Sequence, residues 1–68
     1  MSEPSYAQTV THLARAWNSA AVDGRVPKQV SASVFGRLED AADRAGISQD
    51  DATDDLYAEI DADGPGAR

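Results

Sequence analysis

The sequence predicts an all-α fold, a three-helix mini-bundle, and three observations lead to this prediction. Apolar residues recur at spacings of three and four, which is the period of one helix face. Glycines interrupt this pattern at Gly24 and at Gly46, and a Gly-Pro-Gly sequence ends it. The remaining connections are short, so neighbouring helices pack antiparallel or at a helix-turn-helix-like angle. We expect the helix-turn-helix-like arrangement for the second and third helices.

The first helix is expected over residues 5–22. Ser5 and Gln8 have the spacing of a capping box, in which each side chain bonds to a backbone N–H group of the other residue. The Asp-Gly pair at 23–24 supplies the stop, because glycine adopts the left-handed conformation at a helix end without a steric penalty. The face predicted to be buried consists of Tyr6, Val10, Leu13, Trp17 and Ala20.

The second helix is expected over residues 27–45. Pro27 suits the first turn, where a missing N–H group breaks no helical hydrogen bond. Gly46 ends the helix, and Ile47 follows as the apolar residue that often accompanies such a cap. The apolar face consists of Val30, Val34, Leu38, Ala41 and Ala45, and it is widened by Phe35 and Ala42.

The third helix is expected over residues 48–62. Ser48 is its cap, and the two aspartates of the first turn lie where the helix dipole favours negative charge. Its inner face consists of Ala52, Leu56 and Ile60, with Tyr57 at the edge. Residues 1–63 then form a single helical domain, and residues 64–68 form a disordered C-terminal tail.

Charge is divided unequally along the chain. Residues 1–38 hold two acidic and four basic residues, a balance of +2, whereas residues 39–68 hold ten acidic and two basic residues, a balance of −8. Between Ala45 and Ala67 there is no lysine or arginine. Such an acidic segment repels nucleic acid and lipid headgroups and attracts basic partners. We therefore expect no membrane partner and no direct binding of nucleic acid by this half.

The acidic residues of the third helix are the candidate partner-binding site. Asp50 and Asp54 are four residues apart, as are Asp51 and Asp55, and each like-charge pair costs about 0.2–0.5 kcal/mol on an isolated helix. A helix with such a face either docks onto a basic protein or simply keeps the chain soluble. The predicted contact set consists of Asp50, Asp51, Asp54, Asp55 and Glu59, with Leu56, Tyr57 and Ile60 as apolar anchors.

Composition argues against several other classes of function. The chain has 68 residues and no cysteine, so it has no disulfide, no thiolate metal site and little volume for a catalytic pocket. Its single histidine, His12, lies beside the apolar stripe of the first helix without a marked catalytic partner. We predict a non-catalytic, cytoplasmic protein without a cofactor. Because so short a chain buries little surface, a homo-oligomer is an open alternative.

A metal site is a further alternative for the acidic residues. Glu59, Asp61, Asp63 and Gly64 match positions 1, 3, 5 and 6 of a calcium-binding EF loop. The bidentate glutamate of position 12 would fall beyond the last residue of the printed chain. Half a loop does not surround the ion, so we expect no metal.

One segment resembles the turn of helix-turn-helix DNA readers. It spans residues 40–48, with the sequence Asp-Ala-Ala-Asp-Arg-Ala-Gly-Ile-Ser. In such proteins the second helix enters the major groove, but here its aspartates would be repelled by the phosphates. The resemblance therefore implies the turn geometry. A face that mimics DNA toward a nucleic-acid-binding protein is a further alternative.

Two more segments resemble known families. Residues 52–61, Ala-Thr-Asp-Asp-Leu-Tyr-Ala-Glu-Ile-Asp, are similar to the C-terminal docking helices of modular polyketide synthases, which implies docking through apolar residues and carboxylates. Residues 24–27, Gly-Arg-Val-Pro, followed by Val30, resemble the minor-groove-binding turn of actinobacterial nucleoid-associated proteins. The main alternative function is accordingly a small DNA-associated regulator that uses Arg25, Lys28 and Arg37.

Overall fold

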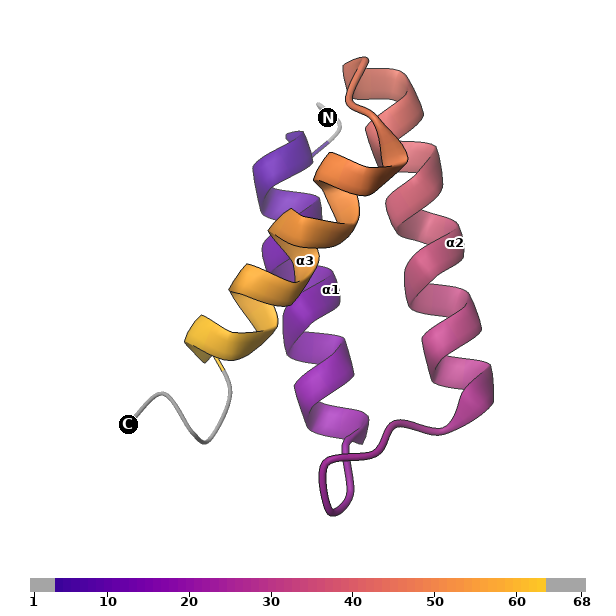
Figure 1. Cartoon of the computed structure of the whole chain (residues 1–68), viewed down its shortest axis with the longest axis vertical. Helices are drawn as coiled ribbons and strands as arrows, with labels where there is room; N and C mark the ends of the chain where they lie inside the picture. The colour runs from indigo at the N-terminus through magenta and orange to yellow at the C-terminus, as the bar shows by residue number, and fades with distance from the viewer. Residues whose placement is uncertain (1–3, 64–68) are drawn as a thin grey trace.

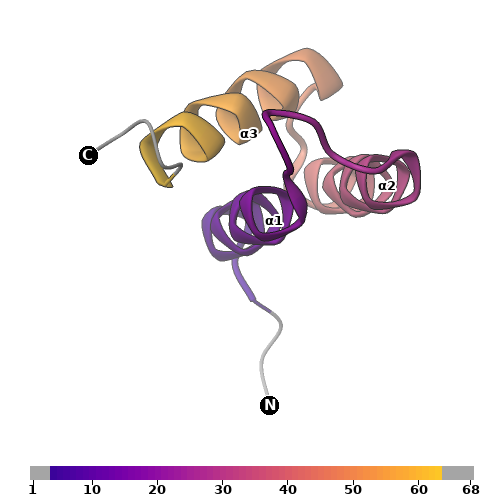
Figure 2. The same ribbon diagram turned by 90° about the horizontal axis from the view of Figure 1, so that it is seen from below.

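Three helices make up the part of the chain that this computed structural model describes, residues 4–63. They are α1 (Tyr6–Ala20), α2 (Lys28–Ala45) and α3 (Gln49–Asp63). The first two lie side by side and antiparallel, and α3 crosses them on one side of the pair (Figure 1, Figure 2). The predicted all-α three-helix bundle is confirmed. The predicted disordered tail, residues 64–68, lies outside the described residues.

The start of α1 is the predicted capping box. The Ser5 hydroxyl accepts a hydrogen bond from the Gln8 backbone N–H (3.1 Å), and the Gln8 side-chain carbonyl accepts one from the Ser5 N–H (2.9 Å). Together the two bonds satisfy N–H groups that a helix start leaves without intrahelical partners. The local sequence therefore determines where α1 begins.

The end of α1 differs from the prediction. Its last residue is Ala20 rather than residue 22, and the Asp-Gly pair forms a separate tight turn instead of the helix cap. Asp23 and Gly24 both have positive φ, 54° and 76°, and the flanking Val22 and Arg25 exchange backbone hydrogen bonds of 2.7 and 3.0 Å. Asp-Gly is a preferred sequence for a turn that needs positive φ at both central positions. Residues 22–25 therefore adopt this turn, and α1 ends two residues earlier than predicted.

The end of α2 is the predicted glycine cap. Gly46 has a φ of 72°, and its N–H donates to the Asp43 carbonyl (3.2 Å). The Ile47 N–H donates to the Ala42 carbonyl (2.9 Å), which completes the Schellman pattern of bonds. Both bonds satisfy carbonyls that the helix end would otherwise leave without partners.

The α2–α3 connection is three residues long, 46–48, and ends in the predicted serine cap. The Ser48 hydroxyl accepts a hydrogen bond from the Asp51 N–H (3.2 Å), which fixes the first turn of α3. After this connection α3 runs obliquely across the other two helices (Figure 1). A short turn followed by an oblique helix is the arrangement that the sequence predicts for α2 and α3.

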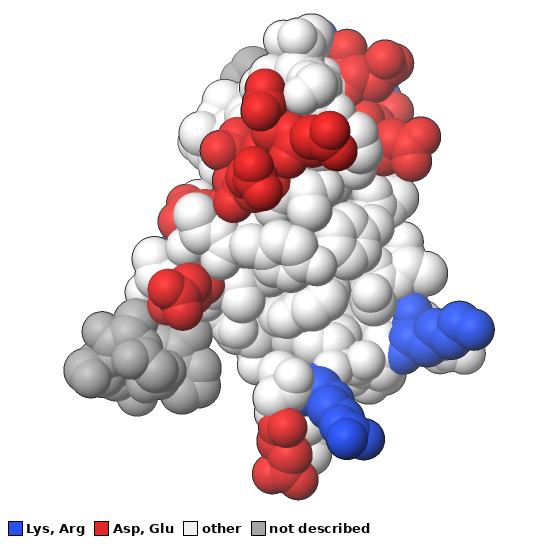
Figure 3. All heavy atoms as spheres, viewed as in Figure 1, with Lys and Arg blue, Asp and Glu red and all other residues white. Residues whose placement is uncertain are grey.

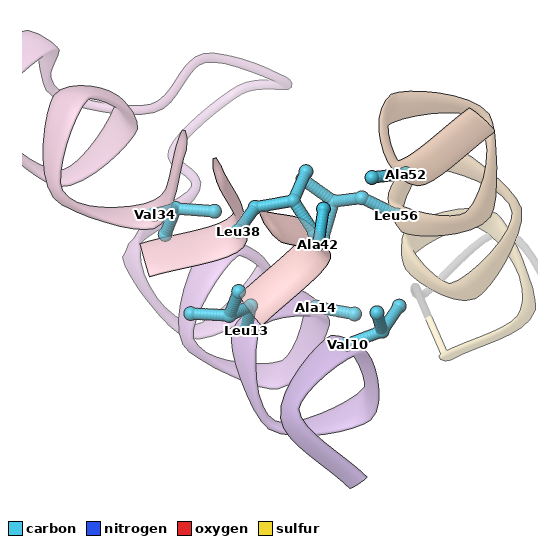
Figure 4. Packing of buried hydrophobic residues seen from close by; sticks show 8 residues of the cluster. All are labelled: Val10, Leu13, Ala14, Val34, Leu38, Ala42, Ala52 and Leu56. Atoms are coloured by element: carbon cyan, nitrogen blue, oxygen red, sulfur yellow. The ribbon is translucent and has the colours of Figure 1, made fainter. Parts of the chain in front are cut away.

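The hydrophobic core lies where the three helices meet (Figure 4). Leu38 of α2 and Leu56 of α3 are its largest fully buried side chains, and they point toward each other. Alanines from all three helices surround them, so the helices approach closely. The buried set consists of Val10, Leu13, Ala14, Val34, Leu38, Ala42, Ala52 and Leu56.

One position of the predicted apolar faces is not covered. Ala45 is exposed, because it is the last residue of α2 and this end of α2 extends beyond α1 and α3 (Figure 1). The larger apolar residues at the margins are partly buried and pack against the core: Tyr6, Trp17, Val30, Phe35, Ile47 and Ile60. The fold also buries Ala14, which the predicted face of the first helix omits, and it leaves Tyr57 half exposed.

Leu56→Ala should destabilise the fold severely, because it removes a fully buried side chain from the centre of the core. Such substitutions cost about 2–5 kcal/mol, which is comparable with the roughly 3–5 kcal/mol that the core of so small a domain supplies. The matched control is Val22→Ala, since Val22 is 68% exposed and its truncation should cost about 0.5 kcal/mol or less. Thermal unfolding followed by circular dichroism compares the two, and a wild-type Tm for Leu56→Ala would contradict the packing described.

Two glycines of the α2 region should respond to alanine with opposite signs. Gly46→Ala should lower the free energy of unfolding by about 1 kcal/mol, because a φ of 72° strains an L side chain. Gly36→Ala should raise it by about 0.5–1 kcal/mol, because a Cβ inside this helix meets nothing within 4 Å. Urea denaturation measures both changes. A Gly46→Ala variant that is at least as stable as the wild type would contradict the described end of α2, and a destabilised Gly36→Ala would contradict the open surroundings of Gly36.

Candidate functional site

The carboxylates of α3 divide into two groups, and the first group contacts α1. The Tyr6 hydroxyl donates a hydrogen bond to Asp55 Oδ2 (2.8 Å), and the Thr11 hydroxyl donates one to Glu59 Oε1 (2.8 Å). We call this row of polar contacts between the two helices the α1–α3 seam. Asp55 and Glu59, two members of the predicted contact set, thus have hydrogen-bond partners within the chain.

Asn18 extends the α1–α3 seam. Its side-chain amide donates to the backbone carbonyl of Ile60 (3.1 Å) and to Asp63 Oδ2 (3.5 Å). Sequence reasoning missed the seam because its partners are 42 to 49 residues apart in the chain. One signal was present: Thr11 and Asn18 are seven residues apart, so both polar groups lie on the same side of α1, next to the apolar stripe.

The Tyr6 phenol is the ionisable donor of the seam. Partial burial, the hydrogen bond to Asp55 and the negative charges of Asp55 and Asp51 together raise the pKa of Tyr6 to about 12. Each of these causes penalises the phenolate, which would lose its hydrogen bond and face two carboxylates. Tyr6 is therefore a protonated donor throughout the neutral pH range.

On the opposite edge of α3, three aromatic rings meet, one from each helix. Their ring centroids lie 5.8 Å apart for Trp17–Phe35, 6.5 Å for Trp17–Tyr57 and 6.2 Å for Phe35–Tyr57, all in edge-to-face geometry. We call these residues the aromatic cluster. Trp17 and Phe35 are half-buried at the margin of the core, whereas 50% of Tyr57 is exposed. Edge-to-face pairs contribute about 0.5–1.5 kcal/mol each, so Tyr57 is exposed but held in place.

The second group of carboxylates lies on the Tyr57 side of α3. Asp50 and Asp54 precede Tyr57 by seven and three residues, and Asp61 follows it by four, spacings that share one side of a helix. All three are exposed, and no ion pair joins them to a cation within residues 4–63. Figure 3 shows carboxylates gathered over α3 beside a broad uncharged area. We call the aromatic cluster and these three aspartates the aromatic–acidic face.

The predicted contact set is only partly brought together by the fold. Three of its members lie on the aromatic–acidic face: Asp50, Asp54 and Tyr57. Asp51 is exposed, but its charge acts on Tyr6 at the seam. Leu56 presents no surface to a partner, because it is a fully buried core residue, and Ile60 is half-buried against the core. The sequence pattern assigns Trp17 and Phe35 to the apolar faces, and their proximity to Tyr57 depends on how the helices cross. The predicted contact set omits Asp61, although its spacing of four residues from Tyr57 is visible in the sequence.

The basic residues of the DNA-binding alternative do not form one patch. Arg25 lies in the α1–α2 connection and Lys28 begins α2. Arg37 follows Lys28 by nine residues, which places it on the opposite side of α2, where it lines a hollow with His12. On the face drawn in Figure 3, lysine and arginine side chains gather at the end formed by the α1–α2 connection and the start of α2.

No protein family model matches this chain, and neither does any curated protein or solved structure. Within residues 4–63, no helix combines the length and apolar character needed to cross a bilayer. The same described part of the chain holds no group of three or more acidic or histidine side chains placed to bind a metal ion.

Tyr6→Phe should remove the hydrogen bond to Asp55 and lower the free energy of unfolding by about 0.5–1.5 kcal/mol at neutral pH. Because the pKa of Tyr6 rises from 10.0 to about 12 on folding, this stabilisation is complete below pH 10 and is lost as the pH rises through 12. Urea denaturation of the wild type and the variant over this range measures the difference. A difference that stays constant across the window would argue against the seam.

Proposed function

We propose that this protein is a non-catalytic interaction module that docks onto a basic partner protein through the aromatic–acidic face. The observation that supports this most strongly is the half-exposed ring of Tyr57, which is held by Trp17 and Phe35 and bordered by carboxylates without a cation partner in residues 4–63. Aromatic side chains dominate binding hot spots. Complementary charges around them increase the association rate and the specificity.

A purely solubilising role accounts less well for the position of these carboxylates. Charges that only maintain solubility can be distributed over the surface with both signs mixed. Here Asp50 and Asp54 lie one turn apart beside an exposed aromatic ring, although such a like-charge pair costs about 0.2–0.5 kcal/mol. A lysine or arginine of a partner would offset the repulsion between Asp50 and Asp54. Binding would therefore remove an unfavourable interaction that is present in the free chain.

The alternative of a DNA-associated regulator has less support. Lys28 and Arg37 lie on opposite sides of α2, so a duplex approaching one does not meet the other. A net charge of −6 would also oppose the approach of phosphates. DNA mimicry is a special case of the proposal, because its target would be a basic, nucleic-acid-binding protein.

Selection from a random displayed peptide library tests the proposal, because it does not require the partner to be identified. Peptides enriched on the wild-type chain in about 0.15 M salt should carry net positive charge together with apolar residues. Trp17 is the only tryptophan and lies in the face, so its fluorescence reports binding of synthetic copies. Their affinity should fall as salt rises, because exposed charge pairs are screened. Enrichment of neutral or acidic peptides would reject the proposal.

Matched amide substitutions locate the binding. Asp54→Asn/Asp61→Asn should weaken an enriched peptide about fivefold, because two exposed ion pairs contribute about 0.2–1 kcal/mol each. The control Asp40→Asn/Asp63→Asn changes the net charge equally. It alters only contacts outside the aromatic–acidic face, the Asp40–Arg44 ion pair and the hydrogen bond from Asn18 to Asp63, so it should change the affinity less than about twofold. Equal losses in both variants would mean that only net charge matters, which contradicts a defined face.

A further inference from the structure

We infer that the partner presents a basic amphipathic α-helix, which lies alongside α3 on the aromatic–acidic face as a fourth helix. This inference rests on the proposed function and specifies the chemistry and shape of the partner segment. Three features favour a helical partner: the backbone hydrogen bonds that the partner needs, the spacing of the aspartates and the charge of the face.

A bound partner segment must satisfy its own backbone hydrogen bonds on this face. An extended peptide needs a sheet edge to satisfy its N–H and C=O groups when it is buried against apolar surface. Residues 4–63 offer no strand, and the isolated bridge of Val22 and Arg25 already uses both of its hydrogen bonds internally. Unpaired amides on the aromatic cluster would carry a large desolvation penalty. A helix satisfies its own backbone groups and can cover aromatic rings without this penalty.

The spacing of the exposed aspartates along α3 matches that of side chains on a parallel helix. Asp50, Asp54 and Asp61 are spread over eleven residue steps of α3, which is about 16 Å of helix. A helix that runs alongside α3 can place lysine or arginine at matching positions, i, i+4 and i+11. Apolar residues near i+7 would then lie against Tyr57 and the aromatic cluster. Helix-in-groove recognition likewise uses side chains three, four and seven residues apart, which share one face of the bound helix.

The charge of the face favours a basic helix over a second copy of this chain as the occupant. The face carries Asp50, Asp54 and Asp61. Arg25 and Lys28 lie in the α1–α2 connection and at the start of α2, the end of the molecule where Figure 3 shows basic side chains. Two copies would therefore bring together surfaces that are each negative on balance. A basic helix is attracted by the aspartates, and it should be neutral or acidic where it approaches Arg25 and Lys28.

Three peptides of one length, about 18 residues or five helical turns, test this inference. The first has arginines at i, i+4 and i+11 and leucines around i+7, the second has the same composition in scrambled order, and the third is the first with two central prolines. The patterned peptide should bind the full chain at least about tenfold more tightly than the other two and gain helical circular dichroism on binding. Trp17 fluorescence gives the affinities.

Substitutions at Tyr57 assign the peptide to the face. Tyr57→Ala should weaken the patterned peptide about tenfold, whereas Tyr57→Phe should bind it like the wild type, because the ring rather than the hydroxyl makes the contact. Tyr57 is 50% exposed, and circular dichroism of each variant alone checks that the fold is retained. The control Asp40→Asn/Asp63→Asn should leave the affinity within about twofold.

The possible outcomes separate the inference from the proposed function. Equal binding of the three peptides would overturn the helical partner but leave a basic partner supported. Failure of the patterned peptide, while library-selected basic peptides bind, would also overturn it. If the library yields no basic peptides either, the proposed function itself fails. Self-association of the chain that Tyr57→Ala abolishes, measured by sedimentation velocity, would assign the face to a second copy and overturn the inference.

Discussion

The burial of Ala52 and Leu56 against α1 and α2 is the constraint on which the rest of the structure depends. It holds in helical form a segment whose aspartates repel one another and which has no lysine or arginine to offset them. The serine cap and the first-turn aspartates favour the start of α3, but they act only over its first turn. Packing of one apolar edge therefore determines where the remaining carboxylates are displayed.

This packing gives the two edges of α3 different roles. Toward α1, Asp55 and Glu59 accept hydrogen bonds from hydroxyl groups, so part of the acidic character serves the fold. On the other edge, Asp54 and Asp61 border Tyr57 and have no cation partner within residues 4–63. Within one run of acidic residues, Asp55 and Glu59 therefore stabilise the contact with α1, whereas Asp54 and Asp61 remain exposed for a basic partner.

Features that depend on nearby residues could be predicted from the sequence, whereas those that depend on helix crossing could not. The capping box at Ser5, the glycine cap at Gly46 and the apolar stripes follow from spacing within a few residues. The end of α1 was misplaced because the Asp-Gly turn competes with the helix for the same residues. The α1–α3 seam and the aromatic cluster join residues from different helices, so local spacing marks at most the α1 side of the seam and not its partners on α3. The apolar stripe places Leu56 on the inner face of the third helix, and its burial there excludes the additional binding role that the sequence suggests.

The central claim is that tertiary packing, rather than local propensity, keeps α3 helical. The most direct measurement compares circular dichroism of a peptide of residues 47–63 with the secondary chemical shifts of the same residues in the full chain. The account predicts a largely unfolded peptide, since isolated helices of up to about 12–15 residues are marginal even in alanine-rich sequences, and the repelling aspartates weaken this one further. It predicts helical shifts throughout 49–63 in the full chain. A peptide as helical as the intact protein, or an unstructured segment in the intact protein, would contradict it.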